Sequence, residues 1–238
     1  MSSKITLPSF SDFISLIYPK LCIVCQEHLS SDNNQLCLTC QNALPETNFH
    51  LTPTDNELIQ RFWGRVELEG AYAFYYFSKS GRVQRLIHQI KYKGNHDLGT
   101  RLGAMYGEVL KDTSVFQAID LILPVPLHPK KKIRRGYNQS EMIVKGIAQA
   151  TNKPWRSDVL IRTVNTTTQT QQKSRAARFE NVKDAFQVTN TQILENKHIL
   201  LIDDVITTGA TLEGCMLQLQ KVKGLKISIA AIGFADHF

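Results

Sequence analysis

From residue 119 onward, short runs of Ile, Leu and Val alternate with stretches that have the apolar spacing of helices. Near-continuous apolar strands of this kind occur where a parallel sheet is covered by helices on both faces. We therefore expect an α/β fold with a mostly parallel sheet flanked by helices. The expected strands are residues 119–123, 159–161, 185–188, 198–202 and 226–232.

The segment before residue 119 predicts further elements. Residues 71–77 are aromatic and β-prone, which favours another strand. A helix is expected next, ending near Gly94, with an apolar stripe at Val83, Leu86, Ile87 and Ile90. Further helices are expected at residues 97–111, 137–150 and 210–222.

The composition excludes two classes of chain. The 238 residues are 42% hydrophobic and 21% charged, which is too apolar for a disordered chain. No stretch reaches the ~18 uninterrupted apolar residues that a membrane-spanning helix needs, so we expect no membrane insertion. The net charge of +7 suits anionic partners such as phosphates or nucleic acid.

The first residues predict a short amphipathic helix rather than a signal peptide. Pro19 and Lys20 interrupt the apolar run, and no small-residue cleavage pattern follows it. The chain is therefore expected in the reducing cytoplasm. The apolar residues that recur at helical spacing are Phe10, Phe13, Ile14 and Ile17.

Four of the five cysteines form two C-x-x-C pairs: Cys22, Cys25, Cys37 and Cys40. Four thiolates at this spacing suit one tetrahedral metal centre with no position left for water, so the metal would be structural. Zinc is the first choice and iron in the same cage is the alternative. A pair of disulfides is the other reading, which a reducing compartment disfavours. Cys215 stands alone at a helical, apolar position and is expected to fill the core.

The chain is expected to have three parts. Residues 1–45 would form the N-terminal helix and cysteine module, and residues 46–70 a polar linker with little structure of its own. Residues 71–238 would form the main domain.

Residues 199–211 carry the most specific pattern in the chain. A buried strand ends in Asp203 and Asp204, passes through a turn rich in Thr and Gly, and enters a helix. Ligands of open α/β sheets bind beyond the carboxyl ends of the strands, and N–H groups at a helix N-terminus favour phosphate. Gly209 allows close approach of the anion, and the carboxylates suit sugar hydroxyls. The pattern predicts a ribose 5-phosphate site; the alternative is an ordinary strand–turn–helix with an acidic turn.

Residues 199–211 resemble the phosphoribosyl-pyrophosphate (PRPP) motif of type I phosphoribosyltransferases. Residues 86–94, 124–139 and 174–186 resemble segments of the ComF family, which includes competence-associated and GntX-like proteins, and so does the four-cysteine segment. The resemblance implies a phosphoribosyltransferase-like core at about residues 116–238 and a hood segment at about 71–115. It implies PRPP contacts at Asp203, Asp204, Val205, Thr207, Thr208, Gly209, Ala210 and Thr211.

The resemblance also implies the rest of a transferase site. The pyrophosphate loop would lie at Val125, Pro126, Leu127 and His128. Residues 163–181, otherwise a polar connector, would fold over bound PRPP and bring Lys173 or Arg175 to the pyrophosphate. A bound Mg²⁺ and these cations would neutralise the leaving pyrophosphate. The catalytic residues implied are Asp203, Asp204, Lys173 and Arg175. Residues 171–173 depart from the family's pattern, which leaves the detailed role of this loop open.

A basic run follows the strand at residues 119–123: Lys130, Lys131, Lys132, Arg134 and Arg135. We expect a loop on the ligand edge of the sheet, with contacts to pyrophosphate or to a nucleic-acid backbone.

The sequence as a whole predicts two candidate functions. One is transfer of the 5-phosphoribosyl group from PRPP to an acceptor that the sequence does not identify. The other is a non-enzymatic competence factor that handles single-stranded DNA alongside competence-machinery proteins and uses PRPP as a ligand.

Overall fold

The computed structural model describes residues 19–29, 35–163 and 185–236 and divides into two compact units, Met1–Leu44 and Pro45–Phe238. The first unit contains both cysteine turns and the short helix α2 (Leu38–Asn42). The helix expected near residues 10–17 lies outside the described residues. No helix in the described ranges has the length and apolar content that crossing a bilayer requires.

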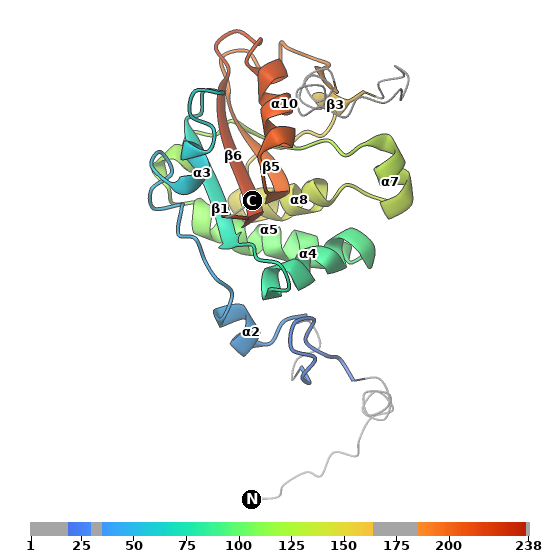
Figure 1. The fold of residues 1–238 in the computed structure, drawn as a ribbon. Coiled ribbons are helices and arrows are strands. Elements are labelled where there is room, and N and C mark those ends of the chain that lie inside the picture. The colour runs from blue at the N-terminus through green and yellow to red at the C-terminus, as the bar shows by residue number, and fades with distance from the viewer. Residues whose placement is uncertain (1–18, 30–34, 164–184, 237–238) are drawn as a thin grey trace, which may run out of the picture. The chain divides into compact units, whose positions relative to one another are not determined.

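The second unit is built on a four-stranded sheet whose neighbours all run parallel, which confirms the expected α/β fold (Figure 1). The strands follow the order β1-β6-β5-β2. Their bounds are Gly70–Tyr76 for β1, Leu121–Pro124 for β2, His198–Ile206 for β5 and Lys226–Phe234 for β6.

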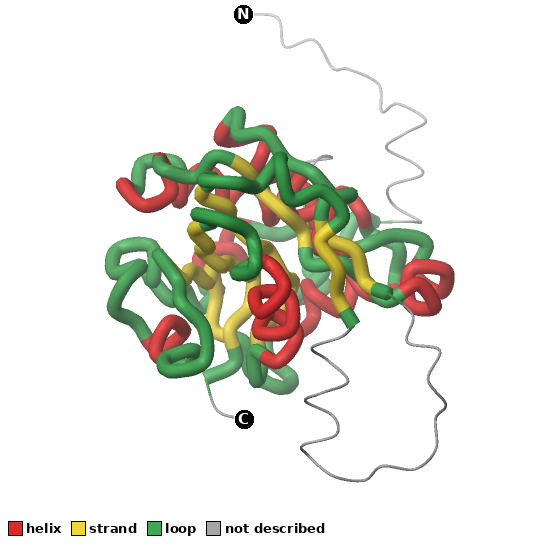
Figure 2. The backbone as a smooth tube through the Cα atoms, turned by 90° about the horizontal axis from the view of Figure 1, so that it is seen from above, coloured by secondary structure: helices red, strands yellow, loops and turns green. Residues whose placement is uncertain are grey.

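Alternate residues of each strand face opposite sides of the sheet, and both sides are covered (Figure 2). On one side, Leu201 and Ile229 share a core with Met216 of α10 (Ala210–Leu219). On the other side, Phe74 stacks on Tyr106 of α5, with 4.6 Å between ring centroids. Helix α5 (His96–Leu110) packs along α8 (Gln139–Thr151).

The remaining helices lie at the edges of this core. They are α3 (Glu57–Gln60), α4 (Arg82–Tyr92), α6 (Ser114–Gln117) and α7 (Pro129–Arg135). The apolar stripe predicted for α4 is buried at all four of its positions. Gly94 follows the end of α4 with a φ of +66°, a left-handed conformation that stops a helix.

Two of the expected strands do not join the parallel sheet. Strands β3 (Leu160–Arg162) and β4 (Phe186–Val188) pair antiparallel with each other in a separate sheet. The free edge of β2 is instead occupied by residues 154–156, where the backbone N–H and C=O of Ile122 bond to Pro154 and Arg156. These two bonds occupy the edge that β3 would need.

Residues 46–70 do not behave as the expected linker. Phe49, Leu58 and Phe62 are buried in the core of the second unit. Asn56 caps α3, and its side-chain amide donates to the Ala71 carbonyl at 2.9 Å. A helix of a single turn is too short to show apolar periodicity, so the sequence pattern did not reveal this packing.

Candidate functional site

Strand β5 carries the acidic pair and leads into the predicted phosphate loop. The strand runs past the expected end at residue 202 because Val205 and Ile206 still pair with Gly233 and Phe234 of β6. Asp203 and Asp204 therefore lie within the strand, and residues 207–209 form the turn before α10.

The turn leads directly into the N-terminus of α10. Gly209 is the N-cap of α10 with a φ of +79°, which favours glycine. The Thr208 hydroxyl accepts a hydrogen bond from the Ala210 N–H at 3.4 Å. A cavity of about 40 Å³ is lined by Asp203 and residues 205–212. This space lies where the N–H groups of the first helical turn have no partner within the helix.

The two carboxylates have different surroundings. Asp204 is buried and forms an ion pair with Lys91, with 2.8 Å between Oδ1 and Nζ. Asp203 accepts hydrogen bonds from the Ser140 hydroxyl at 3.3 Å and from the Asp204 N–H at 2.8 Å. Desolvation by the surrounding protein, and then repulsion by Asp204, raise the pKa of Asp203 to about 7.

Lys91 and Ser140 were not predicted as site residues. They come from the end of α4 and the first turn of α8, which the fold brings to β5. Lys91 lies inside residues 86–94, a segment that resembles the ComF family, so a search for a cation to neutralise the acidic pair would have pointed to it.

Three residues of the expected linker also support the loop. Arg61 donates hydrogen bonds to the carbonyls of Thr207, Ala235 and Asp236. Phe62 lies behind Gly209. Arg65 forms an ion pair with Glu213 in the first turn of α10.

The predicted pyrophosphate loop lies at the same edge of the sheet, because β2 and β5 are parallel neighbours. Val125 donates its N–H to the Ile202 carbonyl at 2.8 Å, and its own carbonyl accepts from the Asn138 amide at 2.9 Å. Pro126 and Leu127 line a cavity of about 170 Å³ that Lys132 and Arg162 also line. Desolvation and the nearby positive charges of Arg162, Lys130 and Lys131 lower the pKa of His128.

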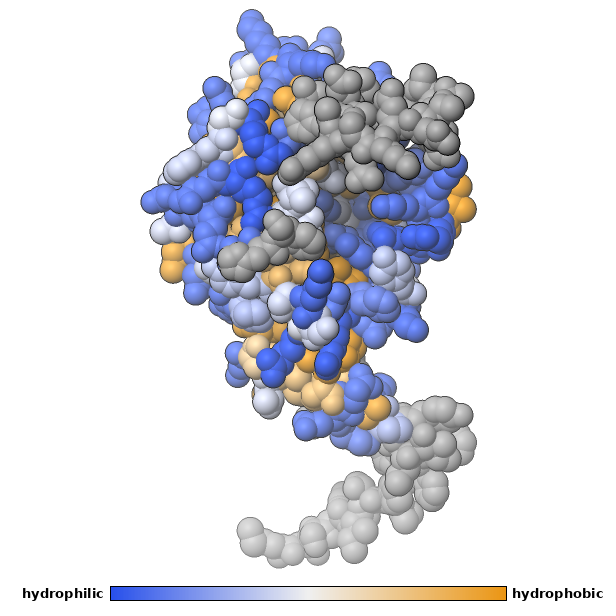
Figure 3. Space-filling model, viewed as in Figure 1, coloured by the Kyte–Doolittle hydropathy of each residue, from blue (hydrophilic) through white to orange (hydrophobic). Residues whose placement is uncertain are grey.

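The basic run forms the helix α7 rather than the expected loop. His128 caps its start by accepting the Lys130 N–H, and Gly136, with a φ of +80°, ends it. None of its residues is buried, and the surface over α7 is strongly hydrophilic (Figure 3). Ile133, at its centre, has 84% of its surface exposed. Lys173 and Arg175 lie outside the described residues.

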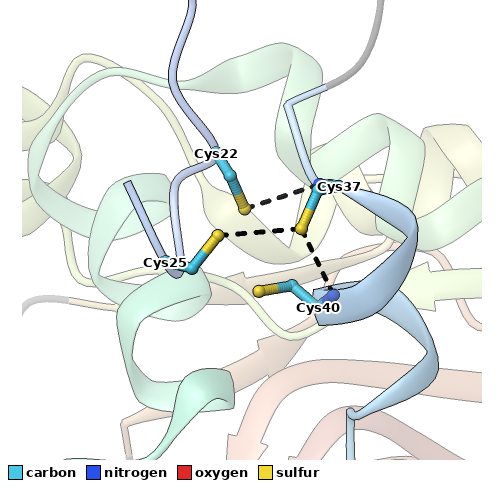
Figure 4. A group of neighbouring side chains, drawn as sticks. All are labelled: Cys22, Cys25, Cys37 and Cys40. Carbon is cyan, nitrogen blue, oxygen red and sulfur yellow. Dashed lines mark hydrogen bonds between the residues drawn. The ribbon is translucent and has the colours of Figure 1, made fainter. Parts of the chain in front are cut away.

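In the first unit, the structure brings the four predicted cysteines together (Figure 4). Their sulfur atoms all lie within 4.8 Å of one another, and the Cys25 and Cys37 sulfurs are 3.7 Å apart. Four thiolates around zinc, with Zn–S bonds of about 2.3 Å, place sulfurs about 3.8 Å apart, so the cluster fits this metal. All four cysteines are free of disulfides.

The electrostatics of the cluster also favour a bound cation. Desolvation opposes ionisation of Cys22, but hydrogen bonds from the backbone of Cys25, Cys37 and Val24 outweigh it and lower its pKa to about 6. Desolvation and the neighbouring thiols raise the pKa of Cys40 to about 12. Four thiolates would therefore repel one another strongly unless a metal neutralises them.

Comparison with known proteins finds a matching domain model and several similar chains. Residues 132–235 match the model of the phosphoribosyl transferase domain. The DNA utilization protein YhgH of Escherichia coli O157:H7 is 29% identical over 196 residues, which cover 80% of each chain. Competence protein F of Haemophilus influenzae is 28% identical over 141 residues, 58% of this chain and 61% of that protein.

A search of solved structures finds the glutamine PRPP amidotransferase from Bacillus subtilis, complexed with ADP and GMP. It is 19% identical and matches 61% of this chain and 30% of its own, with a TM-score of 0.44. Residues 132–235 therefore match the phosphoribosyl transferase domain, and the chain is similar to DNA utilization and competence proteins of the YhgH and ComF type.

Proposed function

We propose that the chain binds PRPP with Mg²⁺ at the carboxyl end of β5 and transfers its 5-phosphoribosyl group to an acceptor, with release of pyrophosphate. The observation that carries this proposal is the single cavity that joins Asp203 to the turn and first residues of α10. A carboxylate for ribose hydroxyls and a helix N-terminus for the 5-phosphate are thereby held side by side.

The reaction is a displacement at the anomeric carbon. The bond from this carbon to the pyrophosphate oxygen breaks, its electron pair leaves with pyrophosphate, and the acceptor forms the new bond and loses a proton. Asp203 and Asp204 would hold the ribose ring and favour its developing positive charge. Residues 207–211 would hold the 5-phosphate, and the turn at residues 125–128 would face the pyrophosphate. Bound Mg²⁺ would supply charge neutralisation of the pyrophosphate.

Calorimetry with PRPP and Mg²⁺ tests the binding site. We expect Asp203→Asn and Asp204→Asn to weaken PRPP binding by at least about tenfold, since each replaces a carboxyl group that can accept hydrogen bonds through both oxygens. Asp158→Asn, which changes an exposed carboxylate paired with Arg156, serves as the control. A wild-type protein that shows no PRPP binding, or Asn variants that bind as well as wild type, would overturn the proposal.

Pyrophosphate release tests the transfer. The wild-type protein, PRPP and Mg²⁺ are mixed with a panel of nucleobases and amines, and pyrophosphate is measured. Release that depends on one acceptor and is lost in Asp203→Asn supports catalysis. If PRPP binds but no acceptor in the panel releases pyrophosphate, the second function below is favoured.

The second candidate is a factor that handles single-stranded DNA with competence-machinery proteins and uses PRPP as a ligand. It is supported by the exposed basic helix α7 and by the names of the relatives, which refer to DNA utilization and competence. The binding constant for a labelled single strand of DNA is expected to fall as the salt concentration rises. In a plot of the logarithm of the binding constant against the logarithm of the salt concentration, each lost phosphate contact should make the slope shallower by about 0.7. Two variants of α7, Lys131→Ala and Arg134→Ala, test whether this helix binds the DNA. Lys223→Ala, in the turn that precedes β6, is the control. Equal affinity in all four proteins would exclude α7 as the DNA site.

We further propose that Cys22, Cys25, Cys37 and Cys40 hold one structural zinc ion. The distances between their sulfurs and the filled tetrahedral ligand set support this assignment. Such a metal leaves no position for a reacting water.

A further inference from the structure

Arg61 connects the phosphate loop to the end of the neighbouring strand. Its guanidinium donates to the Thr207 carbonyl after β5 and, at 2.9 Å each, to the carbonyls of Ala235 and Asp236 after β6. It also lies over the Phe234 ring, 4.4 Å from the centroid. Because the guanidinium is planar with several donors in a fixed fork, one side chain can hold both segments in a defined relation.

This contact sets the orientation of a peptide group in the loop. The peptide that joins Thr207 to Thr208 is planar and trans, so its N–H points opposite to its carbonyl. Since the carbonyl bonds to Arg61, the Thr208 N–H points away from Arg61. A phosphate is held by N–H groups and repelled by carbonyl oxygens. A reversed peptide at this position would therefore bring a repelling oxygen toward the anion.

The next residue, Phe62, supports the loop from behind. A Cβ placed on Gly209 would lie 2.6 Å from the Phe62 ring, and Gly209 has a φ of +79°. Phe62 is 1% exposed, so protein atoms surround the ring. Because glycine tolerates many backbone conformations, a loop that contains it needs an external constraint to keep one arrangement.

We propose that Arg61 and Phe62 are positioning residues for the phosphate site, which hold the peptide between Thr207 and Thr208 in the anion-binding orientation. The inference rests on the proposed PRPP site and adds to it a segment 146 residues earlier in the chain. Arg61 contacts the Thr207 carbonyl, and Phe62 lies next to Gly209. Both residues would therefore affect ligand binding through the backbone of the loop.

Two measurements on the full chain test this inference. Amide hydrogen exchange at residues 207–211, without ligand, reports the order of the loop, and calorimetry with PRPP and Mg²⁺ reports affinity. In Arg61→Ala we expect faster loop exchange and PRPP binding weakened by about tenfold. Millimolar guanidinium added to this variant should restore part of the affinity. Arg156→Ala, which removes an exposed ion pair, is the matched control and should match wild type.

A second variant separates geometry from charge and guards against misfolding. Arg61→Lys keeps a positive charge and an aliphatic stem but lacks the planar fork, and we expect weakened binding with a melting temperature close to wild type. An Arg61→Lys variant that binds PRPP as tightly as wild type would overturn the inference. If wild type does not bind PRPP, the proposed function fails. The inference about Arg61 is then decided by hydrogen exchange alone, and unchanged amide exchange at residues 207–211 in Arg61→Ala would overturn it.

Discussion

At the scale of single residues, the two adjacent aspartates of β5 do different work. Successive side chains of a strand point to opposite faces, so neighbours in the sequence meet different surroundings. Asp204 is neutralised by Lys91, whereas Asp203 lines the cavity beside Ser140. Asp203 thus lines the cavity directly, whereas Asp204 lies at the same end of the strand and is already paired with a cation.

The pKa of Asp203 makes the stability of the protein depend on pH. It is raised from 3.8 to about 7, so between these values the folded state binds more protons than the unfolded state. The free energy of unfolding therefore falls as pH rises through this window. The charges that act on Asp203 are Asp204, which raises its pKa, and Lys91, which lowers it; Arg162 and the Cys215 thiol lie nearby.

We expect Asp203→Asn to flatten this dependence. Urea unfolding measures the free energy of unfolding at pH 5 and at pH 8. Between these two pH values, wild type should lose on the order of 2 kcal/mol more of this free energy than the variant. Asp158→Asn is the control, because Arg156 lowers the pKa of Asp158 to about 2, below this window. An equal loss in wild type and Asp203→Asn would contradict the assignment.

Lys91 is expected to stabilise the fold through Asp204. Lys91→Gln leaves the buried carboxylate without its cation, and we expect a loss of about 2 kcal/mol in the free energy of unfolding at pH 7. Lys93→Gln, on an exposed residue next to the same helix end, should change stability by less than about 0.5 kcal/mol. Chemical denaturation gives the free energy of unfolding of both variants. Equal values would show that the ion pair between Lys91 and Asp204 does not stabilise the fold.

At the scale of elements, the crossing of α5 and α8 depends on close backbone approach. A Cβ on Gly146 of α8 would lie 1.9 Å from the Thr100 carbonyl oxygen and 2.6 Å from the Ala104 N of α5. Both atoms are backbone and cannot rotate away. This crossing places the first turn of α8, and with it Ser140, beside Asp203.

Gly146→Ala should therefore destabilise the protein by about 3 kcal/mol, because the helices must separate to admit one methyl group. Lys145→Ala, at an exposed position one residue earlier on α8, should stay within about 0.5 kcal/mol of wild type. The two variants are compared with wild type by the midpoint temperature of thermal unfolding. A Gly146→Ala protein as stable as wild type would mean that the helices are farther apart than described.

At the scale of the whole molecule, the chain contains two units that are stabilised in different ways. The second has an extended apolar core on both faces of its sheet, whereas the first is a short segment with four clustered thiols. A segment of that size buries too little apolar surface to fold by itself, so metal binding would supply its folding free energy.

Metal analysis of the purified protein should give about one zinc per chain. Cys25→Ala is expected to lose the metal, and chelation of wild type should increase hydrogen exchange in residues 19–29 and 35–44 while the second unit keeps its protection. Cys215→Ala, a buried cysteine of the second unit, should retain full metal content. Retention of zinc in Cys25→Ala would show that the four thiols are not the ligand set.

Local patterns in the sequence predicted the α/β class, the four longest helices of the described residues, the four-cysteine cluster and the strand–turn–helix at residues 199–211. Each of these depends on residues close together in the chain, whose spacing matches a helix, a strand or a turn. The bounds of β5 were harder to predict, because its last residues are held in the strand by pairing with β6.

Only the tertiary structure decided which distant residues meet. The pairs Lys91 with Asp204, Ser140 with Asp203 and Arg61 with Thr207 join residues that are 63 to 146 positions apart in the chain. The antiparallel pairing of β3 and β4 and the burial of residues 46–70 are of the same kind. Such contacts depend on the register of strands and the crossing of helices, and no local spacing along the chain encodes either.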